Sequence, residues 1–253
     1  MHKTAIISPK SKIDSNVDIG PFSIIEDNVS IKKNCKIHSH VVIKSGTSIG
    51  ENCEIFSGSI LGEIPQDLKY NGEDTKLEIG DNNIIREYTT IHKGTIDKVT
   101  TKIGNNCMLM AYSHVAHDST IKNNVILSNS VQVGGHVYID DFAIIGGATP
   151  IHQFCKIGKY SFVGGGYRVV QDVPPFIKAM GEPLKYLGIN SIGLARNNFS
   201  SKEILKIKKA YKILYRSEYN IPQAVSILRE EYSNNRGINE IIKFIDKSAR
   251  GII

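Results

Sequence analysis

Aliphatic residues recur at every sixth position through most of the chain. The register covers residues 13–61, 79–91 and 103–169, and a small or β-branched residue such as Val17 or Ser23 stands four positions after most of the aliphatics. A repeat of six residues supplies one short strand and one turn per unit. Such units bury a continuous core only when their coils stack on one another. The pattern therefore predicts an all-β solenoid.

Two polar stretches interrupt the register, at residues 62–78 and 94–102. The first contains Pro65, Asn71 and Gly72, residue types that favour turns over strands. Loops on a rigid scaffold are common places for binding residues. Both stretches are therefore predicted to be loops that project from the solenoid.

A connector punctuated by Gly and Pro, residues 174–199, follows the repeat. Ser200 and Glu203 then have the spacing of a capping box, which opens a helix. Three groups of apolar residues at helical spacing predict this helix and two more: Ile204, Ile207, Tyr211, Leu214 and Tyr215; Ala224, Val225 and Leu228; and Ile238, Ile241, Ile242 and Ile245. We therefore divide the chain into a β-helix over residues 1–173, the connector, and an α-helical domain over residues 200–253.

The repeat resembles that of the left-handed parallel β-helix acyltransferases, in which three hexapeptides form one triangular coil. The resemblance implies left-handed coils, with each residue lying one coil below the residue three hexapeptides further along. The four cysteines all occupy the small position of their hexapeptides: Cys35, Cys53, Cys107 and Cys155. They are expected to point into the prism as buried apolar side chains rather than to form disulfides.

The charge of the chain is concentrated near its C-terminus. The net charge is +6, and residues 200–253 carry 11 Lys or Arg against 6 Asp or Glu, which is +5 of that total. This imbalance favours an acidic partner at that end, and nucleic acid, anionic lipid or an acidic carrier protein would each fit. The absence of Trp disfavours aromatic stacking on nucleic acid. No apolar run approaches the roughly 20 residues of a membrane span, and no secretory signal opens the chain, so a soluble, cytoplasmic protein is expected.

Histidines cluster in the second half of the repeat. Four of the eight lie between residues 114 and 152: His114, His117, His136 and His152. One coil above His117 is Gly135, next to His136, and two coils above Ala116 is His152. The four histidines are therefore expected near one edge of the prism, beside glycines that allow a ligand to approach the backbone.

His117 is followed directly by Asp118, and a histidine beside a carboxylate is suited to act as a general base that the carboxylate orients. A zinc site is the rival interpretation. It is not favoured, because the sequence contains no pair of histidines five apart and His114 and His117 are three apart. We therefore predict an enzyme site without a metal.

Longer motifs resemble the family of acyl-carrier-protein-dependent UDP-N-acetylglucosamine O-acyltransferases, which opens lipid A synthesis. The resemblance covers nearly the whole chain. The motifs that carry it are Val115–Asp118, Gly134–His136, Asp141–Gly147, Ile151–Cys155, Ile64–Tyr70 and Gln171–Pro175.

The resemblance implies a role for each matched residue. His117 removes the proton from the glucosamine 3-hydroxyl, Asp118 supports His117, and the Gly135 N–H donates to the oxyanion as the hydroxyl attacks the thioester directly. The other implied roles are substrate contacts: Asp67 and Lys69 on the sugar; His114, His136, His152 and Gln153 lining the site; Asn190 and Arg196 on the nucleotide; and Gly165 as a ruler of acyl-chain length.

The resemblance also implies partners and assembly. The donor is a (3-hydroxy)acyl chain carried as the phosphopantetheine thioester of acyl-carrier protein, which is a substrate, and no cofactor is expected. The family forms homotrimers with active sites between subunits, and its basic C-terminal domain helps to dock the acidic carrier. Neither nucleic acid binding nor stable membrane insertion is expected.

Two departures and three alternatives stay open. Asn197 follows Arg196 where the family carries a second arginine, and Pro183 lies near the expected end of the acyl channel. One alternative is N-acylation of the 3-amino analogue of the sugar nucleotide. The others are an acetyl-CoA-dependent hexapeptide acetyltransferase and a scaffold without catalytic activity.

Overall fold

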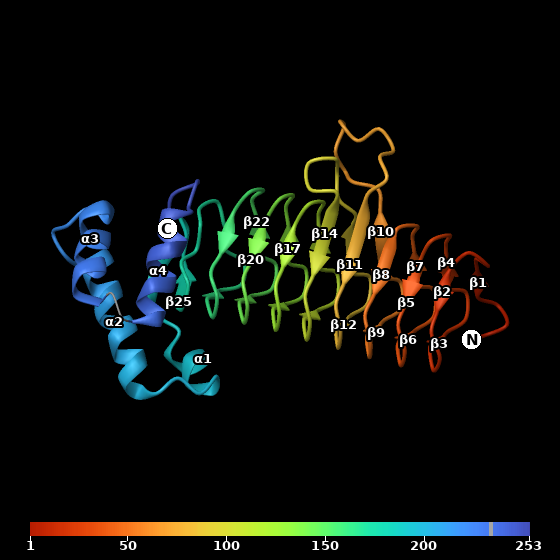
Figure 1. Ribbon diagram of the computed structural model, residues 1–253, viewed down its shortest axis with the longest axis horizontal. Helices are drawn as coiled ribbons and strands as arrows, with labels where there is room; N and C mark the ends of the chain where they lie inside the picture. Colours follow the sequence, from red (N-terminus) through yellow and green to blue (C-terminus); the bar gives the residue numbers. More distant parts are fainter. Residues whose placement is uncertain (233–234) are drawn as a thin grey trace.

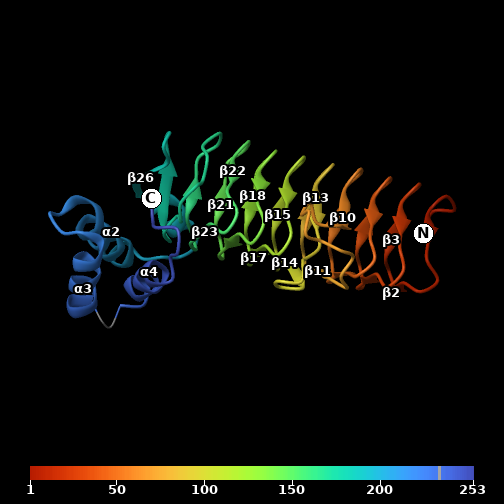
Figure 2. The same cartoon turned by 90° about the horizontal axis from the view of Figure 1, so that it is seen from above.

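Each hexapeptide forms one short strand and one turn, and successive strands pass in rotation to three parallel sheets (Figures 1 and 2). The computed structural model describes residues 1–232 and 235–253. We call the sheets A, B and C in the order in which the chain meets them. Each strand pairs in parallel with the strand one coil away, as Ile24 of one coil does with Val42 of the next. The repeat therefore folds into a three-sided prism.

The strands are short, and their bounds follow the aliphatic register. Sheet A contains β1 (Ile6–Ile7), β4 (Ile24–Ile25), β7 (Val42–Ile43), β10 (Ile60–Glu63), β13 (Thr90–His92), β16 (His114–Val115), β19 (Gln132–Val133) and β22 (Pro150–Ile151). Sheet B contains β2 (Lys12–Ile13), β5 (Ser30–Ile31), β8 (Thr47–Ile49), β11 (Lys76–Ile79), β14 (Thr100–Ile103), β17 (Thr120–Ile121), β20 (Tyr138–Ile139) and β23 (Lys156–Ile157). Sheet C contains β3 (Asp18–Ile19), β6 (Lys36–Ile37), β9 (Glu54–Ile55), β12 (Ile84–Ile85), β15 (Met108–Leu109), β18 (Ile126–Leu127), β21 (Ile144–Ile145), β24 (Phe162–Val163), β25 (Ile177–Met180) and β26 (Lys185–Ile189).

The aliphatic residue of each hexapeptide fills the prism, as predicted. Ile31, Leu109 and Ile145 are 0% exposed, whereas Ile13 in the first coil is only partly buried. The four cysteines are buried and free, which confirms their expected place in the core. The turns contain left-handed residues, many of them asparagine, such as Asn16 with φ 58°. Asparagine tolerates this conformation better than most residues.

Both polar interruptions lie between a sheet A strand and a sheet B strand, and they project from one edge of the prism (Figure 1). They are shorter than predicted. Strand β10 runs on to Glu63 and β11 begins at Lys76, so the first loop is residues 64–75; β14 begins at Thr100 and shortens the second loop likewise. The polar residues at these ends pair with the neighbouring coil, as Lys76 does with Thr100, and this pairing extends the strands.

The predicted connector contains regular structure that its Gly and Pro content concealed. Strands β25 and β26 form an antiparallel hairpin that extends sheet C, and helix α1 (Ser191–Arg196) follows. A short hairpin can end a stack of coils because its backbone pairs with the last exposed strand, here β24.

Three further helices close this end of the molecule: α2 (Ser201–Arg216), α3 (Ile221–Tyr232) and α4 (Arg236–Asp246). Ser200 caps α2 and forms the predicted capping box with Glu203. Most of the predicted inward residues of all three helices are buried, and Ile204, Tyr215 and Ile245 are partly buried against the core. The Tyr211 hydroxyl donates to the Pro175 carbonyl (2.5 Å), which ties α2 to the last coil.

In the described part of the chain, no helix combines the length and the apolar character that crossing a bilayer requires.

Candidate active site

The edge between sheets A and B brings together residues from five coils. We call this the A–B edge; it consists of the turns that follow β10, β13, β16, β19 and β22. This edge contains both projecting loops, the His117–Asp118 pair, Gly135, His136 and Gln153. The stacking of coils thus gathers residues that are more than 80 positions apart in the sequence (residues 67 to 153).

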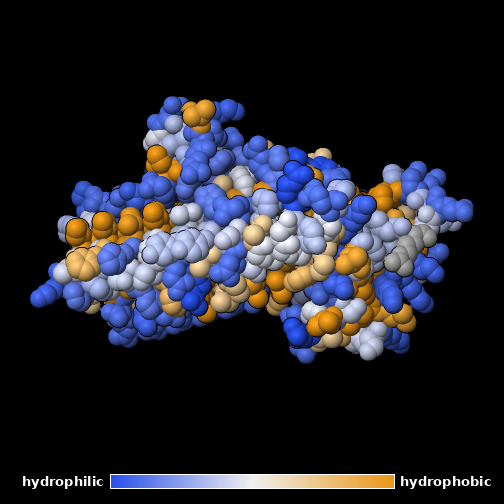
Figure 3. Space-filling model, turned by 180° about the vertical axis from the view of Figure 1, so that it is seen from behind, coloured by the Kyte–Doolittle hydropathy of each residue, from blue (hydrophilic) through white to orange (hydrophobic). Residues whose placement is uncertain are grey.

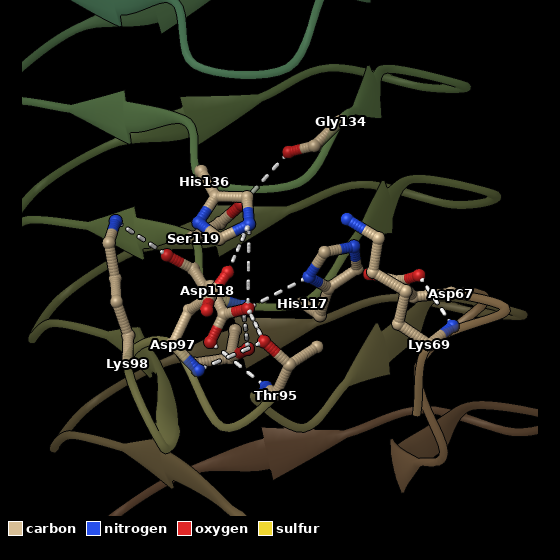
Figure 4. A network of polar contacts seen from close by, with 11 residues as sticks. Asp67, Lys69, Thr95, Asp97, Lys98, His117, Asp118, Ser119, Gly134 and His136 are labelled. Carbon is tan, nitrogen blue, oxygen red and sulfur yellow. Dashed lines mark hydrogen bonds and ion pairs between the residues drawn. The ribbon is translucent and has the colours of Figure 1, made fainter. Parts of the chain in front are cut away.

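His117 and Asp118 form the central pair of this edge (Figure 4). His117 Nδ1 lies 2.9 Å from Asp118 Oδ2. The Asp118 side chain is fully buried, and the His117 side chain is 12% exposed. A carboxylate on Nδ1 places the ring proton there and leaves Nε2 as a lone-pair acceptor. The pair is therefore arranged as a general base with its orienting acid.

Asp118 is held by residues of the second loop that the sequence did not single out. Thr95 donates to the carboxylate twice, from N–H to Oδ1 (2.9 Å) and from Oγ1 to Oδ2 (2.6 Å). Burial alone raises the pKa of Asp118, but the hydrogen bonds from Thr95 and His117 outweigh it and hold this pKa below its usual value. Asp118 therefore stays ionised despite having no solvent contact.

His136 lies one coil above Asp118 and completes the cluster. Its Nε2 is 3.7 Å from Asp118 Oδ2 and 3.8 Å from Asp97 Oδ2, and its ring stacks on Phe154 with centroids 4.5 Å apart. Burial lowers the pKa of His136 although Asp118 opposes this effect. The His117 and His136 rings meet edge to face, with centroids 5.2 Å apart. Two of the four predicted histidines thus share one carboxylate.

Gly135 lies directly above the His117 ring. A Cβ atom at Gly135 would stand 2.8 Å from both Cε1 and Nε2 of His117, which is closer than atoms of this kind approach. Only glycine leaves room for the ring at this point. Among the described residues, no acceptor is hydrogen-bonded to the Gly135 N–H. That donor is available beside the basic nitrogen of His117.

His114 and a histidine that the sequence analysis missed, His92, lie one coil apart on sheet A. Their rings meet edge to face with centroids 4.8 Å apart, and His114 Nδ1 lies 2.7 Å from the Thr90 hydroxyl. His92 is 5% exposed and its Nδ1 has no partner among the described residues. Counting in units of three hexapeptides does not bring His92 to this cluster, because the second loop lengthens the coil and Thr90 pairs with His114 instead.

The remaining predicted residues of this edge are more exposed. His152 lies beyond Gly134 with Nδ1 3.0 Å from the Gln153 carbonyl, and both residues are exposed. Asp67 and Lys69 belong to the first loop, where Asp67 Oδ1 accepts from the Lys69 N–H (2.9 Å). Figure 4 shows Asp67 and Lys69 on the His117 side of the cluster.

Three predicted residues lie on other edges of the same chain. Gly165 follows β24 at the edge between sheets C and A. Asn190 lies at the edge between B and C, where its side chain donates to the Tyr160 carbonyl (3.0 Å) and accepts from the Gly193 N–H as the cap of α1. Arg196 is exposed at the end of that helix. Within a single chain, these residues do not join the His117 cluster.

The same cluster brings possible metal ligands together. One ligand atom each from His117, Asp118 and His136 lies within 4.8 Å of the others. His117 and Asp118 are already hydrogen-bonded to each other, and Thr95 also donates to Asp118. A metal ion would have to displace these hydrogen bonds, so the absence of a metal from the chemistry stays our prediction.

We expect stability to fall with decreasing pH in part through His114. Burial lowers its pKa to about 4, whereas an unfolded histidine titrates near 6.5. Between these values the unfolded chain binds a proton that the folded chain does not, so the free energy of unfolding decreases as pH falls from about 6.5 to about 4. In urea unfolding, His114→Gln should flatten this dependence by up to about 1.4 kcal/mol per pH unit. The exposed His2→Gln change is the control, and equal slopes for both variants would contradict the prediction.

Known proteins match the chain over its whole length. Residues 172–253 match the family model described as UDP N-acetylglucosamine O-acyltransferase, domain 2, and residues 100–135 match the bacterial transferase hexapeptide model. An acyl-[acyl-carrier-protein]–UDP-N-acetylglucosamine O-acyltransferase of Aliivibrio salmonicida is 52% identical, with 100% of this chain and 97% of the relative covered. Its counterpart in Thiobacillus denitrificans is 46% identical, with 100% and 98% covered.

Solved structures agree with these matches. A UDP-N-acetylglucosamine acyltransferase from Bacteroides fragilis superposes with a TM-score of 0.98 at 45% identity, covering 100% of this chain and 99% of the other. One from Acinetobacter baumannii gives 0.97 at 43%, covering 100% and 98%. Fold and site together define an acyltransferase built on a left-handed parallel β-helix. The chain belongs to the family of acyl-[acyl-carrier-protein]–UDP-N-acetylglucosamine O-acyltransferases.

Proposed function

We propose that this acyltransferase moves a (3-hydroxy)acyl chain from acyl-carrier protein to the 3-hydroxyl of UDP-N-acetylglucosamine, the first step of lipid A biosynthesis. The observation that carries the proposal is the buried His117–Asp118 pair, which leaves Nε2 of His117 beside the unpaired N–H of Gly135. A base and an oxyanion donor at one point are what direct acyl transfer needs.

The reaction requires no covalent enzyme intermediate. Nε2 of His117 takes the proton of the sugar hydroxyl while the oxygen attacks the thioester carbonyl and forms the new C–O bond. The carbonyl oxygen becomes an oxyanion, to which the Gly135 N–H donates. Collapse breaks the C–S bond, and the leaving thiolate receives the proton from the His117 imidazolium, which Asp118 stabilises until then. The ester and the free carrier thiol are the products.

We propose that the complete site lies between the subunits of a homotrimer. Within one chain Gly165 and Asn190 are on different edges from His117, so a second copy has to supply them. Apolar side chains lie on the outside of the N-terminal coils (Figure 3), and Ile6 and Ile24 of sheet A are 66% and 37% exposed. Burying such residues against another copy favours assembly. We also place the enzyme in the cytoplasm, as expected from the sequence.

We propose that the acidic carrier docks at the basic C-terminal end. Here a cavity of about 570 Å³ opens from His136 toward α4, and its lining includes Lys98, Lys156, Lys159, Lys243 and Lys247. Lys206, Lys208 and Lys209 of helix α2 are also exposed at this end, and Lys208 and Lys209 line a separate pocket beside β26. The positive field of these lysines attracts an acidic partner at low ionic strength.

Reversing the charge of Lys206, Lys208 and Lys209 to Glu should raise the KM for the carrier about tenfold or more at low salt, and less at high salt. The KM for the sugar nucleotide should stay unchanged. The control is the same reversal of three exposed lysines at the far end of the β-helix, Lys3, Lys12 and Lys36. An unaltered carrier KM at low salt would refute this docking surface.

The proposed reaction is tested by a transfer assay read by mass spectrometry. The enzyme is given 3-hydroxyacyl-carrier proteins of several lengths, with UDP-N-acetylglucosamine and its 3-amino analogue in competition. An ester product supports the proposal and reports the preferred chain length. A preference for the amine would replace the acceptor and keep the mechanism. Two results would overturn the proposal: turnover with acetyl-CoA but not with the carrier thioesters, and no turnover with any donor.

A further inference from the structure

The second loop of the A–B edge, residues 94–99, makes its closest contacts in the candidate site with Asp118, and Asp97 Oδ2 also lies 3.8 Å from His136 Nε2. Thr95 is 6% exposed, and both its N–H and its hydroxyl donate to the Asp118 carboxylate. Lys98 Nζ donates to the Asp118 carbonyl oxygen (2.9 Å). The loop thus hydrogen-bonds to both the side chain and the backbone of Asp118.

The backbone of Asp118 is bonded from the same side. Its φ of 59° is that of the regular turn, shared by Asn124 and His136 in the equivalent positions. Its N–H donates to the Thr101 hydroxyl (2.8 Å), just beyond the loop. The described residues 95–101 therefore bond to the N–H, the carbonyl and both carboxylate oxygens of Asp118.

The Thr95 hydroxyl donates to Oδ2 of Asp118, the same oxygen that faces His117. Asp118 Oδ2 accepts from Thr95 Oγ1 at 2.6 Å and lies 2.9 Å from His117 Nδ1. It is also 3.7 Å from His136 Nε2, which competes for the same oxygen. A fixed donor on one side of Oδ2 restricts the carboxylate to an orientation in which its remaining lone pair faces His117. Without it, only the Thr95 N–H on Oδ1 restrains the carboxylate, and Oδ2 can move toward His136.

We infer that the 94–99 loop is a positioning element for the base, and that Thr95 holds the Asp118 carboxylate on His117. This inference rests on the proposed function, in which His117 is the base. Thr95 contacts neither reacting atom, so it is a positioning residue. Its loss should slow the proton transfer and leave the affinity for both substrates unchanged.

The decisive variant is Thr95→Val, which keeps the shape and the backbone N–H and removes only the hydroxyl. A hydrogen bond to a charged group corresponds to about 10- to 100-fold in rate. We expect kcat to fall by that factor with both KM values within about twofold, and Thr95→Ser to restore most of the rate. The matched control is Thr149→Val, because Thr149 is also buried and its hydroxyl donates to the Gly164 carbonyl on another edge.

A spectroscopic measurement separates this inference from the proposed function. The ¹⁵N spectrum of labelled histidine reports which ring nitrogen of His117 carries the proton. We expect the Nδ1–H form to dominate in the wild type and in Thr149→Val and to decline in Thr95→Val. This result does not depend on knowing the substrates, so it stands even where the transfer assay fails.

Three results would overturn the inference. They are wild-type kcat in folded Thr95→Val, a loss in Thr95→Ser as large as in Thr95→Val, and an unchanged His117 tautomer. Lys98→Met is the second variant in case Thr95→Val does not fold, since it keeps the side-chain stem and removes the donor to the Asp118 carbonyl. It should lower kcat severalfold with the KM for the sugar nucleotide unchanged; the KM for the carrier does not enter this comparison, because Lys98 also lines the proposed docking cavity. Unchanged kcat there would equally count against the loop.

Discussion

Replacing His117 by alanine should reduce kcat by about 10²- to 10⁴-fold, the contribution typical of a positioned general base. The wild-type ring is 12% exposed, with Nδ1 on Asp118 and Nε2 directed to the space below Gly135. Among the described residues no other side chain combines these features: His136 is 3.7 Å from the same carboxylate, and His152 is exposed and bonded to a backbone carbonyl. The proton of the attacking hydroxyl then has no acceptor in place.

The measurement is single-turnover transfer from an acyl-carrier thioester by His117→Ala, with unfolding and oligomeric size measured alongside. The ring is at the edge of the fold and not in its aliphatic core, so the variant should remain folded. His152→Ala is the matched control, and it should lose much less activity. Near-normal kcat in His117→Ala would exclude this residue as the base and direct attention to His136.

The fold could be predicted from the sequence because every coil repeats the same six-residue pattern. The hexapeptide register determines which residue enters the core, so the burial of Ile31, Leu109 and Cys107 follows from counting alone. Which residues stack on each other follows only when the coil of three hexapeptides is added from the family resemblance. That coil, together with the register, placed Gly135 above His117 and His136 beside both. Such predictions succeed because every coil contacts only its neighbours.

The sequence did not predict the structure correctly where the chain departs from the regular hexapeptide register. The loops lengthen two coils, so that Thr90 pairs with His114 and the nearby His92 was not included in the predicted cluster, and Thr95 is one of several polar loop residues with no distinguishing pattern. The β25–β26 hairpin pairs through its backbone, which has no side-chain signature. Gly165 and Asn190 are not among these failures: they lie on other edges than His117 within one chain, so their roles stay predictions that depend on a second copy.

Replacing Gly135 by alanine should reduce kcat by roughly 10²-fold through the position of the base, since displacing a catalytic group by about 1 Å costs that much. The added Cβ would lie 2.8 Å from Cε1 and Nε2 of His117, and its three nearest neighbours are all atoms of that ring. Because the ring is the movable partner, the backbone keeps its conformation and the ring swings away from the reacting oxygen. The Gly135 N–H survives the change, so its loss is not the cause.

Steady-state kinetics of Gly135→Ala, with unfolding in urea, provides the check. The free energy of unfolding should change by less than about 1 kcal/mol, since alanine also lowers the entropy of the unfolded chain. Gly237→Ala in helix α4 is the control, because an added Cβ there approaches no atom closer than 3.5 Å. The double variant His117→Ala with Gly135→Ala should be no slower than His117→Ala alone, since both changes act through one ring. A further loss in the double variant would show that Gly135 serves the reaction independently of His117.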